Sequence, residues 1–346
     1  MTVAAVRARS FVKTLFPGYF ALVMATGIIA IAFQQQDLDV AAKVLYAVAA
    51  IAYVVLGVLF IARCVRYPRA VAFDLAQHAR GFAFLTVVAG TNVLGSASAI
   101  VHGWWGLAWA LWWVSLPLWA VLLYTATIAA VLGQDKPELR DGINGTWFLM
   151  TVATESIAVL AGLHLTRRDG DLLAVVAVAA FTVGFVLYLI VMTMLFTRWT
   201  FSPLDPAEAD PPAWIAAGAV AITTLAGSNL LAAADHQDRL ARLAPFLEGV
   251  TLAAWATATF WFPVMVAIGV WRHIVRRVPL RYHPSYWALV FPLGMYGAAT
   301  FRMIGVLQIE DLDWLPKVTL VIAAVAWAAT TGGLVHHLAT VRRPAA

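Results

Sequence analysis

The stretch WALVFPLGMYGAATFR, residues 287–302, lies in an apolar run but carries features that a purely structural helix avoids. Pro292 removes an intrahelical hydrogen bond and bends a helix. Gly294 and Gly297 have no side chain, and Arg302 adds a charge at membrane depth. Irregular backbone inside a bilayer is tolerated where it lines a cavity. The stretch therefore predicts a membrane helix that borders a pore.

The composition of the whole chain is that of a membrane protein. Of its 346 residues, 62% are hydrophobic and only 12% are charged, whereas a soluble domain is about 45–50% apolar and about 25% charged. A separate soluble domain is not expected, and the net charge of +5 is assigned to membrane orientation rather than to nucleic-acid binding. The single cysteine, Cys64, excludes an internal disulfide and a cysteine-cluster metal site.

Ten stretches are long and apolar enough to span a bilayer, which takes about 17–25 residues. They are 15–34, 40–64, 82–101, 106–132, 144–165, 171–196, 213–234, 245–271, 285–307 and 315–337. The first is interpreted as an uncleaved span, because its run is long and no A-x-A cleavage site follows. These spans predict a cytoplasmic N-terminal segment 1–14, a ten-helix domain 15–337 and a cytoplasmic tail 338–346.

Lysine and arginine positions set the expected orientation. With both termini inside the cell, 16 of the 23 basic residues fall in inside segments and six in outside loops, and Arg302 lies within a span. Because inside loops are enriched in Lys and Arg, we predict a multi-pass protein of the cell membrane with both ends in the cytoplasm.

The spans alternate in character, and this alternation predicts a repeat. Odd-numbered spans carry small and weakly polar clusters: MATG at 24–27, AGTNVLGSAS at 89–98, TVATES at 151–156, LAGSN at 225–229 and GMYGAAT at 294–300. Even-numbered spans are bulkier, and the odd ones recur every 62–72 residues. We therefore predict an all-α fold of five parallel hairpins, with the small-residue helices in an inner ring around a central pore.

Residues of these clusters are the predicted pore kink and lining. They are Thr26, Gly27, Gly90, Thr91, Thr151, Thr154, Gly227, Ser228, Pro292, Gly294 and Gly297. The alternative interpretation is that small residues let helices pack closely. Phe291, beside the proline kink, is predicted to be a movable plug in a narrow tube, the alternative being an aromatic side chain of the core.

Three stretches resemble the tellurite-resistance/dicarboxylate transporter family. FPGYFALVMATGIIAIA at 16–32 resembles the first helix of the family, INGTWFLMTVATES at 143–156 the fifth, and WALVFPLG at 287–294 the ninth. The resemblance covers about residues 14–338. The family includes bacterial TehA, fungal malate permeases and sulfite exporters, and the slow-type anion channels of plant guard cells.

The resemblance implies five helical hairpins around a pore, with one pore in each protomer of a homotrimer in the lipid bilayer. It also implies that a phenylalanine on the ninth helix occludes the pore, and Phe291 is the matching residue. The implied function is transport of small inorganic anions or of four-carbon dicarboxylates such as malate. The alternative is a ligand-binding or sensory membrane protein that keeps the fold but conducts nothing.

The sequence differs from the channel members of the family at two charged residues within spans. Glu155 lies near the bilayer midplane and is either a proton-binding site coupled to anion movement or a hydrogen-bonded structural residue. Arg302 either attracts anions to the outer mouth or serves structure, by reaching the interface or by pairing with a loop acid such as Glu310, Asp311 or Asp313.

The sequence does not favour an enzyme, a cofactor or a metal site. Haem would need axial ligands on facing helices, and all histidines lie in predicted loops or near helix ends: His78, His102, His164, His236, His273, His283, His336 and His337. No glycine-rich phosphate loop and no nucleophile elbow is present in the sequence.

Overall fold

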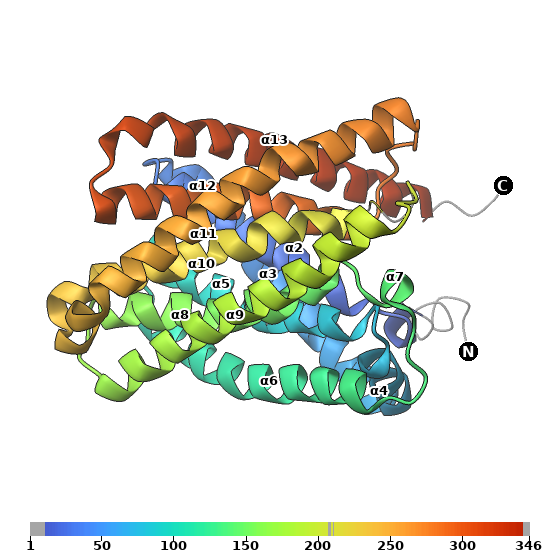
Figure 1. Ribbon diagram of the computed structural model, residues 1–346, viewed down its shortest axis with the longest axis horizontal. Helices are drawn as coiled ribbons and strands as arrows, with labels where there is room; N and C mark the ends of the chain where they lie inside the picture. Colours follow the sequence, from blue (N-terminus) through green and yellow to red (C-terminus); the bar gives the residue numbers. More distant parts are fainter. Residues whose placement is uncertain (1–10, 207–208, 210, 342–346) are drawn as a thin grey trace.

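The chain folds into a bundle of long helices (Figure 1). The computed structural model describes residues 11–206, 209 and 211–341, which contain no β-strand. Ten helices within these residues are long and apolar enough to cross a membrane, which confirms the predicted all-α, ten-helix fold. Arg7, Arg9, Arg342 and Arg343, which were counted for orientation, lie outside the described residues. The proposed N-terminal segment and tail stay predictions.

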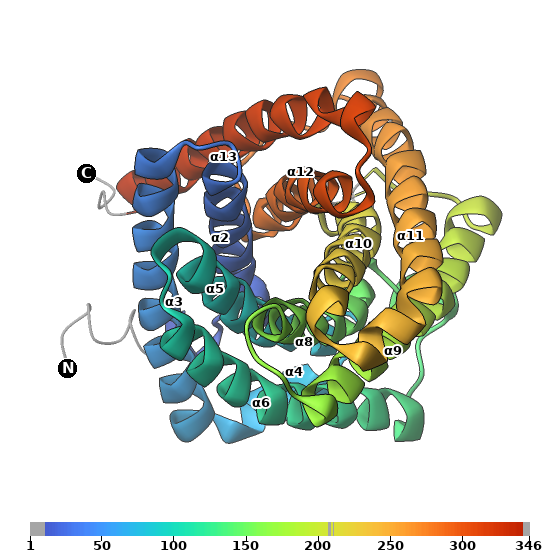
Figure 2. The same cartoon turned by 90° about the vertical axis from the view of Figure 1, so that its left-hand side faces the viewer.

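The long helices form an inner ring and an outer ring that surrounds it (Figure 2). The inner helices are α2 (Ala21–Gln34), α5 (Thr86–His102), α8 (Leu149–Leu165), α10 (Ile215–Ala233) and α12 (Trp287–Leu307). The outer helices are α3 (Asp39–Arg66), α6 (Trp105–Leu132), α9 (Asp171–Phe201), α11 (Asp238–Val270) and α13 (Trp314–Val341). Each inner helix contacts the next one in the chain, and α12 contacts α2, which closes the ring.

Burial separates the two rings as the alternation of the spans predicted. In the most apolar window of each span, 67–100% of the residues of the inner helices are buried, against 11–39% for the outer helices. Small side chains on the inner helices let five helices approach one another around one axis. The outer helices present bulky apolar side chains to the lipid.

Shorter elements join the long helices. They are α4 (Pro68–Ala76), α7 (Leu139–Gly142), η5 (Ala234–His236), the π-helical turn η6 (Trp271–Val275) and η8 (Glu310–Leu312). Helix α11 begins seven residues before the predicted span 245–271 and continues through Pro245. Its first turns carry Arg239 and Arg242, so they lack the apolar character on which the prediction of spans rests.

A 3-10 turn precedes every inner helix. The turns are η1 (Pro17–Phe20), η2 (Gly81–Leu85), η3 (Gly145–Phe148), η4 (Pro211–Trp214) and η7 (Pro284–Tyr286). In each repeat a Pro or Gly is followed three residues later by Phe or Trp: PGYF, GFAF, GTWF, PPAW and PSYW. Proline suits the first turn of a helix, because its missing N–H would have no intrahelical partner there. The five turns gather at one end of the bundle, which we call the near end; the opposite end is the far end.

Candidate functional site

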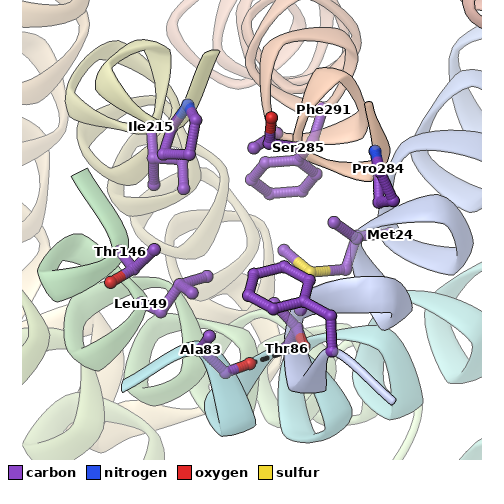
Figure 3. A pocket seen from close by; sticks show the side chains of 14 residues that line it. Met24, Ala83, Thr86, Thr146, Leu149, Ile215, Pro284, Ser285 and Phe291 are labelled. Atoms are coloured by element: carbon purple, nitrogen blue, oxygen red, sulfur yellow. Dashed lines mark hydrogen bonds between the residues drawn. The ribbon is translucent and has the colours of Figure 1, made fainter. Parts of the chain in front are cut away.

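A cavity, called the near cavity, lies on the axis of the inner ring at the near end (Figure 3). Its volume is about 30 Å³, measured as the space open to the centre of a water-sized sphere, which is room for about two water molecules. The lining residues labelled in Figure 3 are Met24, Ala83, Thr86, Thr146, Leu149, Ile215, Pro284, Ser285 and Phe291. Side chains from all five inner helices or their 3-10 turns therefore meet at this point.

The 3-10 turns place these side chains. Residues three apart lie nearly above one another in a 3-10 turn. All five repeats contribute such pairs to the lining: Gly18 with Ala21, Ala83 with Thr86, Thr146 with Leu149, Pro212 with Ile215, and Ser285 with Ala288. Hydrogen bonds fix neighbouring turns to one another. The Thr86 hydroxyl donates to the carbonyl oxygens of Pro17, at 3.0 Å, and Ala83, at 2.8 Å. The near cavity is thus a product of the five-fold repeat.

Phe291 lies at the inner limit of the near cavity and is only 1% exposed. The next residue, Pro292, lies inside α12 and packs against Gly218 of α10, where an added Cβ would lie 2.7 Å from the proline Cγ. Gly218 therefore allows α10 to approach the bent part of α12. Sequence reasoning did not single out this glycine, since the close approach joins two segments far apart in the chain.

A second cavity, called the far cavity, lies on the other side of Phe291. Its volume is about 10 Å³, measured in the same way, and it is lined by Ile28, Ile31, Asn92, Val93, Ser96, Ser156, Val159, Ile222, Leu225 and Met295. Met295 is one helical turn beyond Phe291 on α12, a rise of about 6 Å. Phe291 lines the near cavity and not the far one, and along α12 it lies between Ala288, which lines the near cavity, and Met295, which lines the far cavity.

The threonines predicted to line the pore bond to the outer ring. The hydroxyls of Thr26, Thr91 and Thr154 lie 2.8–3.0 Å from the polar atoms of Trp327, Tyr53 and Trp119. The same arrangement joins Trp255 of α11 to Thr300 of α12 at 3.1 Å. In four of the five repeats, an aromatic side chain of an outer helix thus bonds to a threonine of the inner helix of the next hairpin.

The predicted small residues contact neighbouring helices. An added Cβ would meet Val93 at Gly27, Phe20 at Gly90, Thr251 at Gly227, Ile29 at Gly294 and Thr319 at Gly297. Ser228 donates to the carbonyl of Thr224, and Thr151 is fully buried. None of the eleven predicted kink and lining residues, all within the described part of the chain, lines either cavity. Their role as pore lining stays a prediction.

Glu155 is fully buried, and its recorded contacts are with α9 and α10. Its Oε1 accepts a hydrogen bond from Thr223 of α10 at 3.0 Å. An added Cβ at Gly184, in the middle of α9, would lie 2.7 Å from Glu155 Cγ. In the remaining repeat, Thr223 of α10 thus bonds to Glu155 of α8, and Gly184 of the outer helix α9 packs against the same Glu155 side chain. The other carboxyl oxygen, Oε2, is buried and has no hydrogen-bond partner among the described residues, so both interpretations of Glu155 stay open.

We expect Glu155→Gln to fold and to keep the pH dependence of anion flux, because glutamine retains an oxygen that accepts from Thr223. Flux into liposomes at several pH values checks this result. Gly184→Ala is the matched control at the same contact, and we expect it to cost about 1–3 kcal/mol of stability through overpacking. A flattened pH profile in well-folded Glu155→Gln protein would assign proton coupling to Glu155.

Arg302 is half-buried near the far end of α12. Its Nε donates to Asn229 Oδ1 at 3.1 Å, and Asn229 Nδ2 donates to the carbonyl of Val159 at 3.1 Å. Val159 lines the far cavity, so a chain of hydrogen bonds connects Arg302 to its wall. Among the described residues, no ion pair joins Arg302 to an acid of the following loop.

Several site residues were missed by sequence reasoning. Met24, Thr86, Leu149 and Ile215 line the near cavity. All follow the Pro/Gly-x-x-Phe/Trp motif within a few residues, so the motif indicates the segment in which they lie. Asn92 and Ser96 line the far cavity, but their cluster AGTNVLGSAS was used only for its small residues.

A ring of five hairpins around two axial cavities defines a polytopic membrane transport protein. Residues 14–335 match the voltage-dependent anion channel family (SLAC1), and the chain belongs to this family. The resemblance seen in the sequence is thereby confirmed.

Three relatives illustrate the range of similarity. An uncharacterized membrane protein of Mycobacterium tuberculosis is 35% identical over 153 residues, which cover 44% of this chain and 77% of that protein. An uncharacterized transporter of Methanocaldococcus jannaschii is 23% identical over 315 residues, with 89% and 90% covered. A sulfite efflux pump of Trichophyton rubrum is also 23% identical over 315 residues, with 84% and 82% covered. Family and relatives support anion transport as the activity of this multi-pass protein.

Proposed function

We propose that the chain carries small anions along the axis of its inner ring, and that Phe291 is the gate. The observation that supports this proposal is that the buried side chain of Phe291 lines the near cavity and that Met295, one helical turn farther along α12, lines the far cavity. In support, no Asp or Glu is among the described residues that line either cavity, so no carboxylate on the axis would repel an anion.

We further propose that the near end faces the cytoplasm of a cell membrane, in accord with the distribution of basic residues. A homotrimer is proposed from the family resemblance. The substrate belongs to the small inorganic anions or to four-carbon dicarboxylates such as malate. Sulfite joins the candidates because one relative is a sulfite efflux pump.

Flux measured with the purified protein in liposomes tests this function. We expect at least one of chloride, nitrate, sulfite and malate to enter protein-containing liposomes faster than empty ones. Wild-type protein with a closed gate can pass little, so Phe291→Ala is measured beside it. No flux of any of the four anions through either protein would favour the non-conducting ligand-binding or sensory alternative.

We expect Arg302→Gln to reduce anion flux about two- to fivefold at low ionic strength and much less at high salt, because salt screens the attraction of exposed charge. Flux across a series of salt concentrations checks this result. Lys317→Gln is the matched control, since Lys317 is exposed at the far end on outer helix α13. Equal flux of Arg302→Gln and wild type at every salt concentration would assign Arg302 to structure.

A further inference from the structure

The far cavity combines an apolar wall with three polar side chains. Asn92 and Ser96 of α5 and Ser156 of α8 are the polar residues, and the other seven lining residues are aliphatic or methionine. Asn92 and Ser96 are four residues apart and therefore share one face of α5. The cavity, of about 10 Å³, takes a particle about the size of one water molecule.

Hydrogen bonds within the protein already engage some of the polar atoms of Asn92 and Ser156 at the far cavity. Asn92 Oδ1 accepts from Ser115 Oγ of the outer helix α6 at 2.6 Å. Asn92 Nδ2 donates one hydrogen to Ser156 Oγ at 2.9 Å, and Ser156 Oγ donates its own hydrogen to the carbonyl of Ala153 at 2.7 Å. These bonds hold the Asn92 amide in one orientation, because its oxygen and one N–H are both engaged.

Two hydrogen-bond donors at the far cavity, one N–H of Asn92 and the O–H of Ser96, have no acceptor among the described residues. An amide group carries two N–H hydrogens, and the described residues provide a partner for one of those of Asn92. Ser96 is 3% exposed, and its Oγ has no hydrogen-bond partner among the described residues. An unpaired buried donor costs about 1–3 kcal/mol. Two such donors on one helix face therefore indicate a ligand that accepts hydrogen bonds.

The charges near the cavity favour an anion as this ligand. No carboxylate is among the described residues of the wall. In the neighbouring Glu155, Oε1 accepts from Thr223 of α10, and Oε2 has no partner among the described residues. The nearest basic residue along α12 is Arg302, which is linked through Asn229 to the carbonyl of Val159. A cation would find no ligating carboxylate here.

We propose that Asn92 and Ser96 form a binding site for a single small inorganic anion, held on the far side of Phe291 by one N–H and one O–H donor. This site rests on the proposed function, in which anions pass along the axis, and it names the residues that hold the ion beyond the gate. The anion accepts the two hydrogen bonds that Asn92 and Ser96 do not donate to other described residues.

The test measures chloride flux against chloride concentration in the Phe291→Ala background, where the path is open. We expect Ser96→Ala to raise the half-saturating chloride concentration about tenfold to a hundredfold, the loss of one hydrogen bond to an ion. Asn92→Asp replaces the donor by an oxygen of the same shape, and we expect a larger increase. Ser98→Ala is the control on the same helix, because Ser98 bonds to Leu94 and to Tyr46 of outer helix α3.

Crystals soaked in iodide give a second readout that does not depend on flux. We expect an anomalous peak between Asn92 Nδ2 and Ser96 Oγ in the Phe291→Ala protein, lost in Ser96→Ala. Unchanged half-saturation in well-folded Ser96→Ala, or a water molecule in place of iodide, would overturn the site. An iodide peak in a protein that passes no anion would support the site and overturn conduction.

Discussion

Phe291→Ala is expected to raise anion conductance by roughly tenfold or more, since a barrier lower by only about 1.4 kcal/mol already gives this factor. In the proposed function, the ring closes the path from the near cavity, which Phe291 lines, to the far cavity, which Met295 lines. Its removal joins the two cavities into one path. Conductance in planar bilayers, or anion flux into liposomes, measures the change.

The same substitution separates a gate from a core side chain through its effect on stability. In a packed core, Phe→Ala typically costs about 3–5 kcal/mol. At Phe291 we expect a smaller loss, because water from the two cavities can fill the space of the ring. Phe260→Ala is the control, since Phe260 is 62% exposed on α11. A strongly destabilised Phe291→Ala protein with no added conductance would contradict the gate.

Gly145→Ala is expected to lower the stability of the folded protein by about 1–3 kcal/mol or more, the range for overpacking. An added Cβ would lie 2.0 Å from the carbonyl oxygen of Pro212 and 2.2 Å from its carbon. Both are backbone atoms, so η3 has to move away from η4. Thr146 of η3 and Pro212 of η4 both line the near cavity, so the shift also reaches the axis.

Thermal unfolding of the purified protein in detergent measures this loss. Gly57→Ala is the matched control, because an added Cβ at Gly57 of outer helix α3 meets nothing within 4 Å among the described residues. Alanine also favours a helix over glycine by about 0.5–1 kcal/mol. An unfolding temperature for Gly145→Ala equal to that of Gly57→Ala would show that η3 and η4 are not held as closely as the structure has them.

The sequence by itself determined the number of spans, their order and their division into two rings. Long apolar runs mark the spans because a bilayer core has a fixed thickness. Small residues in alternate spans indicate which helices pack most closely. Phe291 was singled out by its place beside Pro292 and by the family resemblance, and both are local features of the sequence.

Only the tertiary structure decided which face of each inner helix meets the axis. An inner helix is apolar and buried all around, so no polar face marks its direction. Thr26, Thr91 and Thr154 therefore looked suited to a pore, yet they bond to aromatic side chains of the outer ring. Asn92 and Ser96, from one of the same clusters, line the far cavity instead.

Glu155 is a further residue whose surroundings could not be predicted from the sequence. Its place in a span was evident from the sequence, but its neighbours, Gly184 and Thr223, lie 29 and 68 residues farther along the chain. A glycine in α9 leaves space that a side chain from α8 fills, and this complementarity exists only once the helices pack. The sequence thus determined which helices form the two rings, whereas their rotation about their own axes, set by side-chain packing, decided which residues line the two cavities.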